Sequence, residues 1–384
     1  MHDDAVVCSF VPPYILVHVS EHGDAEQRER ARIALETSSQ MRGERIAMTE
    51  VAIARGIAPG EERRTVYDAQ NKRALPGKLV RGEGSAALKD VAVNEAYDGA
   101  GSTYDFYSRV FNRNSIDGRG MRLDSSVHFG VKYTNAQWNG RQMIYGDGDG
   151  KLFNRFTAAL DVIGHELTHG VTQFTAALDY QDEPGALNEH FSDVFGVLVK
   201  QYALKQTATK ADWLIGAGLF AKGVKGLAVR SMKAPGTAYD DPILGKDPQP
   251  ATMKGFVHTQ DDNGGVHVNS GIPNQAFYRT AIALGGKAWE VAGRIWYQAL
   301  THELRHDASF ADCADATARV ARELHGDASA AYHAVVQGWA AVGITVHRAI
   351  VRSGPRVPIA DHLVAPIGGA EVPMLAPREK RVSR

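Results

Sequence analysis

The segment that constrains this chain most is HELTH at residues 165–169, which lies inside a stretch with helical periodicity. We predict a helix over 157–174, because apolar residues recur there at the spacing of one helical face. Residues four apart on a helix share a face, with Cβ atoms about 6 Å apart, so His165 and His169 point to one place. Two such imidazoles bind one Zn²⁺, and Glu166 beside them reaches a water at the same place. A chain with 15 histidines also forms this pattern by chance, so the motif needs further support.

A second segment with helical periodicity carries two acidic residues one turn apart, Glu189 and Asp193. A catalytic zinc takes three protein ligands and keeps one position open. Two carboxylates this close repel each other unless each has a cationic or hydrogen-bonding partner. Glu189 as the third zinc ligand and Asp193 as the acceptor of a ligand imidazole N–H would satisfy both. The alternative is a solvated acidic helix face, which the apolar neighbours of the two residues make less attractive.

A third feature is a glycine pair at 264–265 that leads into His267, with Asp262 close enough in sequence to orient the ring. An imidazole held in this way beside a zinc site can donate a hydrogen bond to a developing oxyanion. A single histidine in such a place is more often structural. The zinc motif elsewhere in the chain favours the catalytic interpretation here.

The sequence pattern changes along the chain from short β-type runs to longer helical periods. This change predicts an α+β protein with a cleft between two halves. A small N-terminal appendage contains a helix that starts near Asp24 and ends near Gly43. Short β-type runs follow, and longer helical patterns begin near residue 156. The expected strands include 127–133 and 142–145, and the other expected helices cover 93–111, 185–205, 267–284, 287–303, 308–324 and 328–341. The last residues show no periodicity and are expected to be disordered.

Several stretches together resemble the thermolysin family of zinc neutral metallopeptidases. They are NEAYDGAGSTYDFY (94–107), NAQWNG (135–140), YGDGDG (145–150), DVIGHELTHGVTQ (161–173), GALNEHFSDVFG (185–196), RSM (230–232) and DNGGVHVNSGIPN (262–274). The stretches PPYIL (12–16) and EHGDAEQRERA (21–31) are similar to the short propeptide of the protealysin-like branch of that family. The resemblance covers nearly all of the chain except the tail.

The resemblance implies a two-lobed zincin fold of the α+β class, with the zinc site in the cleft between a β-rich lobe and a helical lobe. It divides the chain into a propeptide-like appendage (1–64), an N-terminal catalytic lobe (65–180), a C-terminal helical lobe (181–347) and a tail (348–384). It also implies a zymogen whose propeptide inhibits the enzyme intramolecularly. The enzyme itself would then remove the propeptide.

The activity that the resemblance implies is zinc-dependent endopeptidase activity. The zinc ligands of the family match His165, His169 and Glu189. Its catalytic carboxylate matches Glu166, which takes a proton from a water held by the zinc and passes it to the leaving amine. The residues that hold the oxyanion match Tyr180 and His267.

The resemblance also implies how supporting and substrate-binding residues act. Asp193 matches the partner of the first histidine ligand, and Asp262 matches the carboxylate that orients the catalytic histidine. Asn135 matches a contact to a substrate amide, the carbonyl of Ala136 accepts the N–H of the attacked amide, and Arg230 contacts the substrate carbonyl on the leaving-group side. The apolar specificity pocket matches Phe153, Phe156, Val162 and Val229, which implies cleavage before bulky hydrophobic residues.

The chain departs from the family at the paired Ca²⁺ site that many members carry. Asp161 and Asp212 match calcium ligands, but Lys200, Leu214 and Ala217 stand where acidic residues are expected. A lysine places positive charge where Ca²⁺ needs anionic oxygens. We therefore predict that the double calcium site is lost, with room for at most one weaker calcium.

The amino-acid composition limits the kinds of molecule that this chain can bind. Lys and Arg number 43 against 44 Asp and Glu, so charge alone argues against nucleic acid or an anionic membrane as partners. There is no run of about 18 apolar residues, so we expect no membrane span. We expect a monomer that acts on protein or peptide substrates. The acidic start of the chain does not resemble an ordinary signal peptide. The family favours secretion, here by a route without such a signal, and a cytoplasmic precursor is the alternative.

The two cysteines, Cys8 and Cys313, do not form a disulfide framework. Cys313 falls on the apolar side of a predicted helix and is interpreted as core packing. The thiolate of Cys8 is a candidate ligand for the open zinc position in the precursor. A chance thiol in a flexible segment is the alternative.

Two other functions are alternatives to a zinc endopeptidase. A non-catalytic, zinc-stabilised binding module would tolerate the loss of Glu166 or His267, and both are present. A zinc aminopeptidase would need a cluster of acidic residues to anchor the substrate amine, and no such cluster is recognisable in the sequence.

Overall fold

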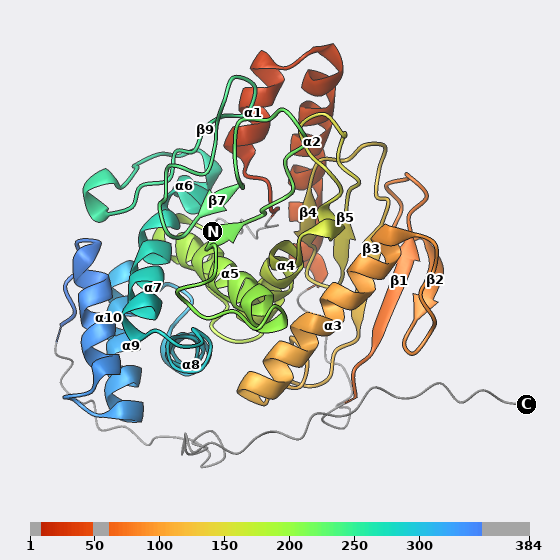
Figure 1. Ribbon diagram of the computed structural model, residues 1–384. Helices are drawn as coiled ribbons and strands as arrows, with labels where there is room; N and C mark the ends of the chain where they lie inside the picture. The colour runs from red at the N-terminus through yellow and green to blue at the C-terminus, as the bar shows by residue number, and fades with distance from the viewer. Residues whose placement is uncertain (1–8, 49–60, 348–384) are drawn as a thin grey trace, which may run out of the picture. The chain divides into compact units, whose positions relative to one another are not determined.

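The computed structural model describes residues 9–48 and 61–347, and the predictions for Cys8 and for the tail from residue 348 lie outside these ranges. Figure 1 shows helices α4 and α5 at the centre, with a sheet and α3 on one side and helices α7 to α10 on the other. Helices α1 and α2 lie at one end. The expected α+β organisation is confirmed, with the sheet in the N-terminal part and helices in the C-terminal part.

The sheet has five strands in the order β2-β1-β3-β5-β4, so β4 is an edge strand. Its pairs β1–β3 and β3–β5 are parallel, and β1–β2 and β4–β5 are antiparallel. The strands are β1 (Arg64–Asp68), β2 (Lys78–Gly82), β3 (Leu123–Val127), β4 (Ala136–Trp138) and β5 (Met143–Tyr145). Two small antiparallel pairs follow, β6 (Leu214–Ile215) with β7 (Arg230–Ser231) and β8 (Asp240–Asp241) with β9 (Gly245–Lys246).

The helices account for most of the remaining core. They are α1 (Pro13–His22), α2 (Ala25–Met48), α3 (Val91–Phe111), α4 (Leu160–Gln173), α5 (Asp182–Ala203), α6 (Asp262–Asn269), α7 (Gly271–Leu284), α8 (Ala292–Gln298), α9 (Phe310–His325) and α10 (Ala330–Ala341). Short 3₁₀ turns lie at Phe156–Ala158 and Met253–Gly255, and a π-helical turn at Ala299–Glu303 continues α8. Cys313 is buried in the core, as the sequence predicted.

Two glycines let α4 and α5 cross closely at the centre of the molecule. A Cβ on Gly196 would lie 2.5 Å from the carbonyl oxygen of Asp161, and a Cβ on Gly164 would lie 3.1 Å from the Cα of Gly196. Any larger residue would force the two backbones apart. The close crossing brings the turn of α4 that carries the histidines against the turn of α5 that carries the acids.

Most expected helices are present, and the main differences are one helix end, one additional helix and one strand. The helix that starts after Asp24 continues past Gly43 to Met48, because the residues after the glycine are good helix formers. Helix α1 was not expected, although its first residue, Pro13, is a favoured residue at a helix start. The strand predicted over 127–133 is wrong, since strand β3 ends at Val127.

The backbone after β3 turns because His128 and Lys132 adopt left-handed φ values of 53° and 52°. Nδ1 of His128 lies 2.9 Å from both carboxylate oxygens of Asp147, and Nε2 lies 2.9 Å from Asp90. Asp90 also caps α3 by accepting from two backbone N–H groups. The hydrogen bond to Asp147 contributes most, and the bond to Asp90 adds to it. Together they outweigh partial burial and raise the pKa of His128 to about 9.

The first prediction concerns this imidazole. Its pKa in the folded chain lies above the 6.5 of an ordinary histidine, so the charged ring stabilises the fold fully below about pH 6.5. The contribution disappears as the pH rises through about 9. We therefore expect the difference in free energy of unfolding between the wild type and His128→Gln to shrink as the pH is raised past this point in urea titrations. A difference that stays constant at alkaline pH would contradict this role.

Candidate active site

Two imidazoles of α4 and one carboxylate of α5 meet in the interior. Nε2 of His165 lies 3.0 Å from Nε2 of His169. The carboxylate of Glu189 lies 3.5 Å from the first nitrogen and 3.6 Å from the second. Each of the three side chains is 1% exposed. The i, i+4 spacing in α4 and the close crossing of α5 together produce this convergence.

Hydrogen bonds fix which nitrogen of each ring faces the centre. Nδ1 of His165 lies 2.8 Å from the carboxylate of Asp193, which can only accept, so this nitrogen carries the hydrogen. Nδ1 of His169 lies 2.8 Å from Oδ1 of Asn188, whose amide group donates to the carbonyl of Leu178. Both Nε2 atoms therefore present lone pairs to each other and to Glu189.

A Zn²⁺ ion fits this set of atoms. Tetrahedral zinc with ligand bonds of 2.0–2.1 Å separates neighbouring ligand atoms by about 3.4 Å. The three separations of 3.0, 3.5 and 3.6 Å bracket this value. Two imidazoles and a carboxylate form a known ligand set of catalytic zinc, and a cation between them removes the repulsion of their lone pairs.

Glu166 lies beside these atoms without taking the place of Glu189. One of its carboxylate oxygens accepts the backbone N–H of Trp138 at 2.8 Å, which ties it to the edge strand β4. Its carboxylate and the ring nitrogens of His165 and His169 all lie within 4.8 Å of one another. The side chain is fully buried. The structure thus holds a buried carboxylate beside the two converging imidazoles.

The buried carboxylate of Asp193 joins several parts of the site. Besides the ring of His165, it accepts Nη2 of Arg230 at 2.8 Å and Nε of Arg230 at 3.0 Å. Asn274 donates to it at 2.9 Å. Burial by itself favours the neutral acid, but Arg230 and His165 outweigh it and hold the pKa of Asp193 well below its usual range.

Behind Asp193 lies a chain of hydrogen bonds that sequence reasoning missed. The indole N–H of Trp296 donates to Nε2 of His190 at 2.8 Å, and Nδ1 of His190 lies 2.8 Å from Oδ1 of Asn274. Because an indole only donates, His190 carries its hydrogen on Nδ1, and the amide N–H₂ of Asn274 must face Asp193. Burial lowers the pKa of His190 to about 4, so the ring is neutral. Nothing in the sequence links these three residues.

The residues expected to bind an oxyanion lie on the other side of Glu189. The hydroxyl of Tyr180 donates to Glu189 and lies 3.2 Å from Nε2 of His267. Asp262 accepts the backbone N–H of His267 at 2.9 Å and lies 2.6 Å from its Nδ1. Burial lowers the pKa of His267, but Asp262 and Glu189 outweigh it, so the net shift is upward.

The turn that places Asp262 has an unusual backbone. The four residues 262–265 all have positive φ, between 50° and 81°, and the last two are glycines. Such a left-handed turn is favourable mainly for glycine and asparagine. It folds the carboxylate of Asp262 back onto His267, which the glycine pair in the sequence suggested.

The N-terminal segment 9–11 lies across the expected substrate contacts. The N–H of Phe10 donates to the carbonyl of Ala136 at 2.9 Å, and Nη1 of Arg230 donates to the carbonyl of Phe10 at 3.2 Å. The amide side chain of Asn135 bonds both the N–H of Val11, at 2.8 Å, and its carbonyl, at 3.2 Å. All three residues that the sequence assigned to substrate binding therefore contact this segment.

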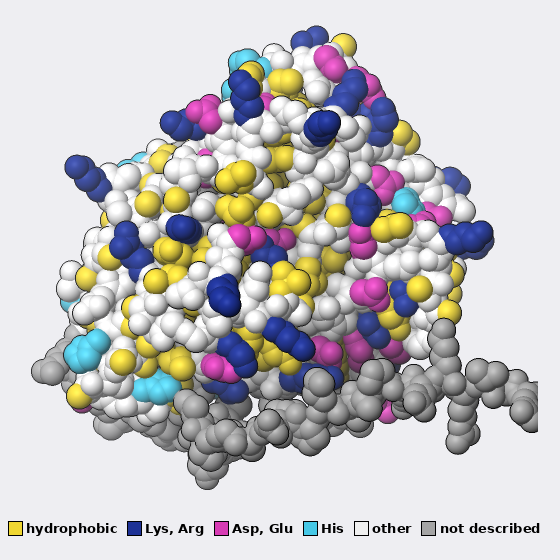
Figure 2. All heavy atoms as spheres, in the orientation of Figure 1, with side chains coloured by type: hydrophobic (Ala, Val, Ile, Leu, Met, Phe, Trp, Pro, Cys, Tyr) yellow, Lys and Arg dark blue, Asp and Glu magenta, His cyan; other side chains and the backbone are white. Residues whose placement is uncertain are grey.

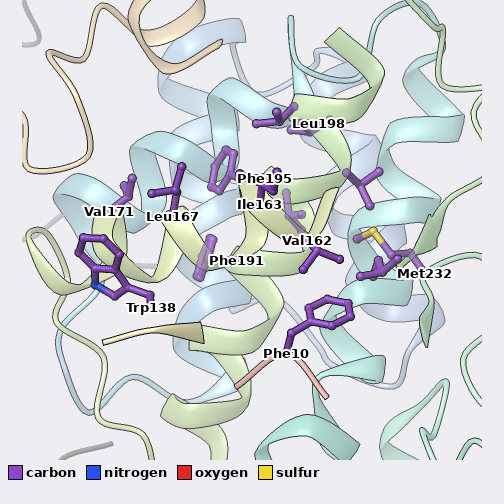
Figure 3. Packing of buried hydrophobic residues seen from close by; sticks show 14 of the residues in the cluster. Phe10, Trp138, Val162, Ile163, Leu167, Val171, Phe191, Phe195, Leu198 and Met232 are labelled. Carbon is purple, nitrogen blue, oxygen red and sulfur yellow. The ribbon is translucent and has the colours of Figure 1, made fainter. Parts of the chain in front are cut away.

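The side chain of Phe10 is fully buried in the apolar core. Its ring meets the ring of His165 edge-on with centroids 5.4 Å apart, and the guanidinium of Arg230 lies 4.7 Å from its centroid. Figure 3 shows it beside Val162 and Met232. The same core cluster contains all four residues that the sequence assigned to a specificity pocket, namely Phe153, Phe156, Val162 and Val229.

Gly216 also borders this ring, and the sequence did not indicate it. A Cβ at Gly216 would lie 3.0 Å from Cζ of Phe10, and its φ of 72° already favours glycine. A larger residue here would reduce the space that Phe10 occupies.

Lys200, which the resemblance places at a position of a calcium ligand, lies among three oxygen acceptors. Its ammonium donates to Asp161 at 2.8 Å, to Asp212 at 3.1 Å and to the carbonyl of Leu214 at 2.7 Å. Burial lowers its pKa, but Asp161 and Asp212 outweigh burial and raise it above the usual value. The lysine is therefore a cation built into the chain among oxygen ligands.

Three protein-family models match successive parts of the chain. Residues 36–173 match the model described as "Thermolysin metallopeptidase, catalytic domain", and residues 176–344 match "Thermolysin metallopeptidase, alpha-helical domain". Residues 8–43 match "Protealysin propeptide". An extracellular metalloprotease of Pectobacterium carotovorum is 50% identical over 89% of this chain and 98% of the relative.

The chain belongs to the thermolysin family of metallopeptidases. The protease PrtS of a Photorhabdus strain is 47% identical over 88% of this chain and 92% of the relative. The precursor of protealysin from Serratia proteamaculans is a solved structure with 53% identity and a TM-score of 0.80, and it matches 88% of this chain and all of the solved one. These relatives make the chain a metalloendopeptidase with a propeptide, and they give no support to a binding module or an aminopeptidase.

Two broader expectations concern a membrane span and the distribution of charge. Among residues 9–48 and 61–347, no helix combines the length and apolar character needed to cross a membrane. On the face shown in Figure 2, Lys and Arg side chains are scattered among Asp and Glu and do not form one basic patch. The charge balance of the sequence is thus also seen on this face.

Proposed function

We propose that this thermolysin-family enzyme is a zinc endopeptidase whose metal is bound by His165, His169 and Glu189. The observation that carries the proposal is the convergence of these three side chains beside the buried carboxylate of Glu166. When bound, Zn²⁺ supplies a Lewis acid that polarises the substrate carbonyl and acidifies water. The residues of the chain supply proton transfer, orientation and exclusion of solvent.

In this mechanism Glu166 is the general base and then the general acid. Its carboxylate takes a proton from the attacking water and delivers it to the nitrogen of the leaving amine. Tyr180 and His267 donate hydrogen bonds to the oxyanion that forms on the attacked carbonyl. Asp262 holds the imidazole of His267 for this task, as their 2.6 Å contact supports.

Substrate binding uses Asn135, the carbonyl of Ala136 and Arg230. The N-terminal segment supports this assignment, because its backbone bonds all three. A bulky apolar side chain following the cleaved bond would enter the space that Phe10 fills, and we expect Phe153, Phe156, Val162 and Val229, which belong to the same core cluster, to line it. We therefore propose cleavage before bulky hydrophobic residues.

The chain is proposed to be a precursor in which residues 1–64 form the propeptide, 65–180 and 181–347 form the two lobes, and the enzyme acts as a monomer. The propeptide inhibits intramolecularly, since substrate cannot enter while Phe10 and Val11 occupy its contacts. Removal of the propeptide by the enzyme itself would then release activity. Action outside the cell is proposed from the relative named as an extracellular metalloprotease.

We further propose that the paired calcium site of the family is replaced by Lys200. Its ammonium neutralises Asp161, which is 2% exposed, without any bound ion. A cation bound through the chain itself needs no calcium from the solvent. Stability should therefore be independent of added calcium.

The prediction for this site combines ion addition with substitution. Millimolar calcium chloride should leave the thermal midpoint of calcium-free, zinc-loaded enzyme unchanged. Lys200→Met should lower the free energy of unfolding by about 3 kcal/mol, because it leaves a buried carboxylate without its counter-charge. Lys222→Met, at an exposed lysine, is the matched control and should have little effect. A large rise in midpoint with calcium would contradict the proposal.

The prediction for the catalytic carboxylate uses Glu166→Gln. Hydrolysis of casein by this variant should fall by about 10²–10⁴-fold relative to the wild type, because the base is lost. Both chains are first trimmed by a tagged wild-type enzyme that is then removed. Zinc content should be unchanged, and 1,10-phenanthroline should abolish the wild-type activity. Glu303→Gln, remote from the site, is the control. Activity that survives both the substitution and the chelator would overturn the proposed function.

A further inference from the structure

The N-terminal segment binds in the direction of a substrate and not in the reverse direction. Ser9 pairs antiparallel with Gln137 on the edge strand β4, so the segment extends the sheet as an added strand. Along this strand, Phe10 bonds Ala136 and Arg230, and Val11, the next residue, bonds Asn135. The order of these contacts along the segment sets its register in the site.

The register identifies one peptide bond. In the proposed function, the carbonyl of Ala136 accepts the N–H of the attacked amide, and Arg230 contacts the carbonyl on the leaving-group side. Here that N–H belongs to Phe10, and that carbonyl is also the carbonyl of Phe10. The amide at the position of attack is therefore the one that joins Ser9 to Phe10. The bulky apolar Phe10 is also the kind of residue before which we propose cleavage.

We propose, on the basis of the proposed function, that the precursor hydrolyses its own Ser9–Phe10 bond. Water adds its hydroxyl to the carbonyl carbon of Ser9, and the carbon–nitrogen bond to Phe10 breaks. The proton that Glu166 takes from water goes to the nitrogen of Phe10. The products are a peptide with a carboxylate at Ser9 and a chain with a new amino terminus at Phe10.

The cut is an intramolecular step. Ser9 is 5% exposed and Phe10 is fully buried, so the bond is out of reach of a second enzyme molecule. Groups of the same chain already hold it, since Ala136 and Arg230 bond the backbone of Phe10 and the ring of His165 packs against its side chain. The rate of the cut is therefore independent of protein concentration, in contrast to cleavage between molecules.

The new end stays in place after the cut, so this step does not activate the enzyme. Helix α1 is anchored by the buried side chains of Ile15, Leu16 and Val19. Nδ1 of His18 also lies 2.9 Å from the carbonyl of Ile243, in the catalytic part of the chain. Phe10 and Val11 therefore continue to occupy the substrate contacts.

A cluster of charges adds to this attachment at the start of α2. Lys151 lies 3.1 Å from both Asp24 and Glu26, and Lys132 also pairs with Glu26. These pairs are partly exposed, so each contributes little by itself. Together with α1 they hold residues 10–48 on the enzyme until a later cut further along the chain.

The test follows the mass of freshly purified, zinc-loaded full-length chain over time. We expect loss of the peptide that ends at Ser9, a new amino terminus at Phe10, and the same first-order rate at protein concentrations that differ tenfold. Casein hydrolysis should stay low until residues from Phe10 onward are also lost. The Glu166→Ala chain should remain whole.

Two substitutions, one at Phe10 and a control on α1, make the test more specific. Phe10→Asp puts a charge into the apolar space and should slow the cut at this bond by at least about tenfold. Val17→Asp, at a side chain 45% exposed on α1, is the matched control and should leave the rate unchanged. In metal-free Glu166→Ala protein, which cannot react, the amide hydrogens of Phe10 and Val11 should exchange slowly with deuterium. Asn135→Ala should speed exchange at Val11.

The outcomes separate this inference from the proposed function. A chain that hydrolyses casein after losing its propeptide, but whose Ser9–Phe10 bond stays intact until then, would overturn the inference alone. A rate that rises with protein concentration would overturn the intramolecular cut. Absence of both self-cleavage and casein hydrolysis would overturn the proposed function and this inference with it.

Discussion

The structure of the site depends on one buried carboxylate, that of Asp193. It accepts hydrogen bonds from the ring of His165, from Arg230 and from Asn274 while having no exposure to solvent. A charge buried in this way is tolerated only because its partners are in place. The same carboxylate that orients His165, a proposed zinc ligand, thus also holds the arginine that contacts the carbonyl of Phe10.

This arrangement links the proposed metal site to the contacts of the N-terminal segment. The orientation of His165 is fixed on one side by Asp193 and, behind it, by the chain of donors that begins at Trp296. Arg230 is fully buried and reaches the carbonyl of Phe10 only with Nη1, because its other donors are directed to Asp193. The proposed metal site and the peptide contact therefore both depend on the carboxylate of Asp193. A second buried carboxylate, that of Asp161, is likewise neutralised from within the chain, by the ammonium of Lys200.

Local sequence patterns predicted the parts of the site that lie on single helices. The spacing of His165 and His169 and the spacing of Glu189 and Asp193 follow from the 3.6-residue period of a helix. The substrate contacts and the pocket came from the resemblance, because they involve residues from distant parts of the chain. Helix positions were predicted well, since periodicity and capping are local properties.

Other features depend on contacts that no local pattern reveals. The hydrogen bonds from Trp296 to His190 and from His190 to Asn274 join residues 106 and 84 positions apart. The strand expected over 127–133 has apolar alternation, but the contacts of His128 with Asp90 and Asp147 accompany a left-handed turn there. The register of Phe10 against Ala136 likewise depends on tertiary structure, and the sequence showed only that the segment resembles a propeptide.

The central claim is that Asp193 holds the metal ligand His165, and zinc affinity tests it most directly. Asp193→Asn keeps the shape but leaves Arg230 without its counter-charge, and it presents an amide N–H₂ group toward donors. Its zinc dissociation constant, measured by competition with a chelator, should rise by about 10–100-fold relative to the wild type. Asp241→Asn is the control, because that buried carboxylate accepts only the backbone N–H groups of Lys225, Ile243 and Leu244 in the described part of the chain. A folded Asp193→Asn chain with wild-type zinc affinity would contradict the account.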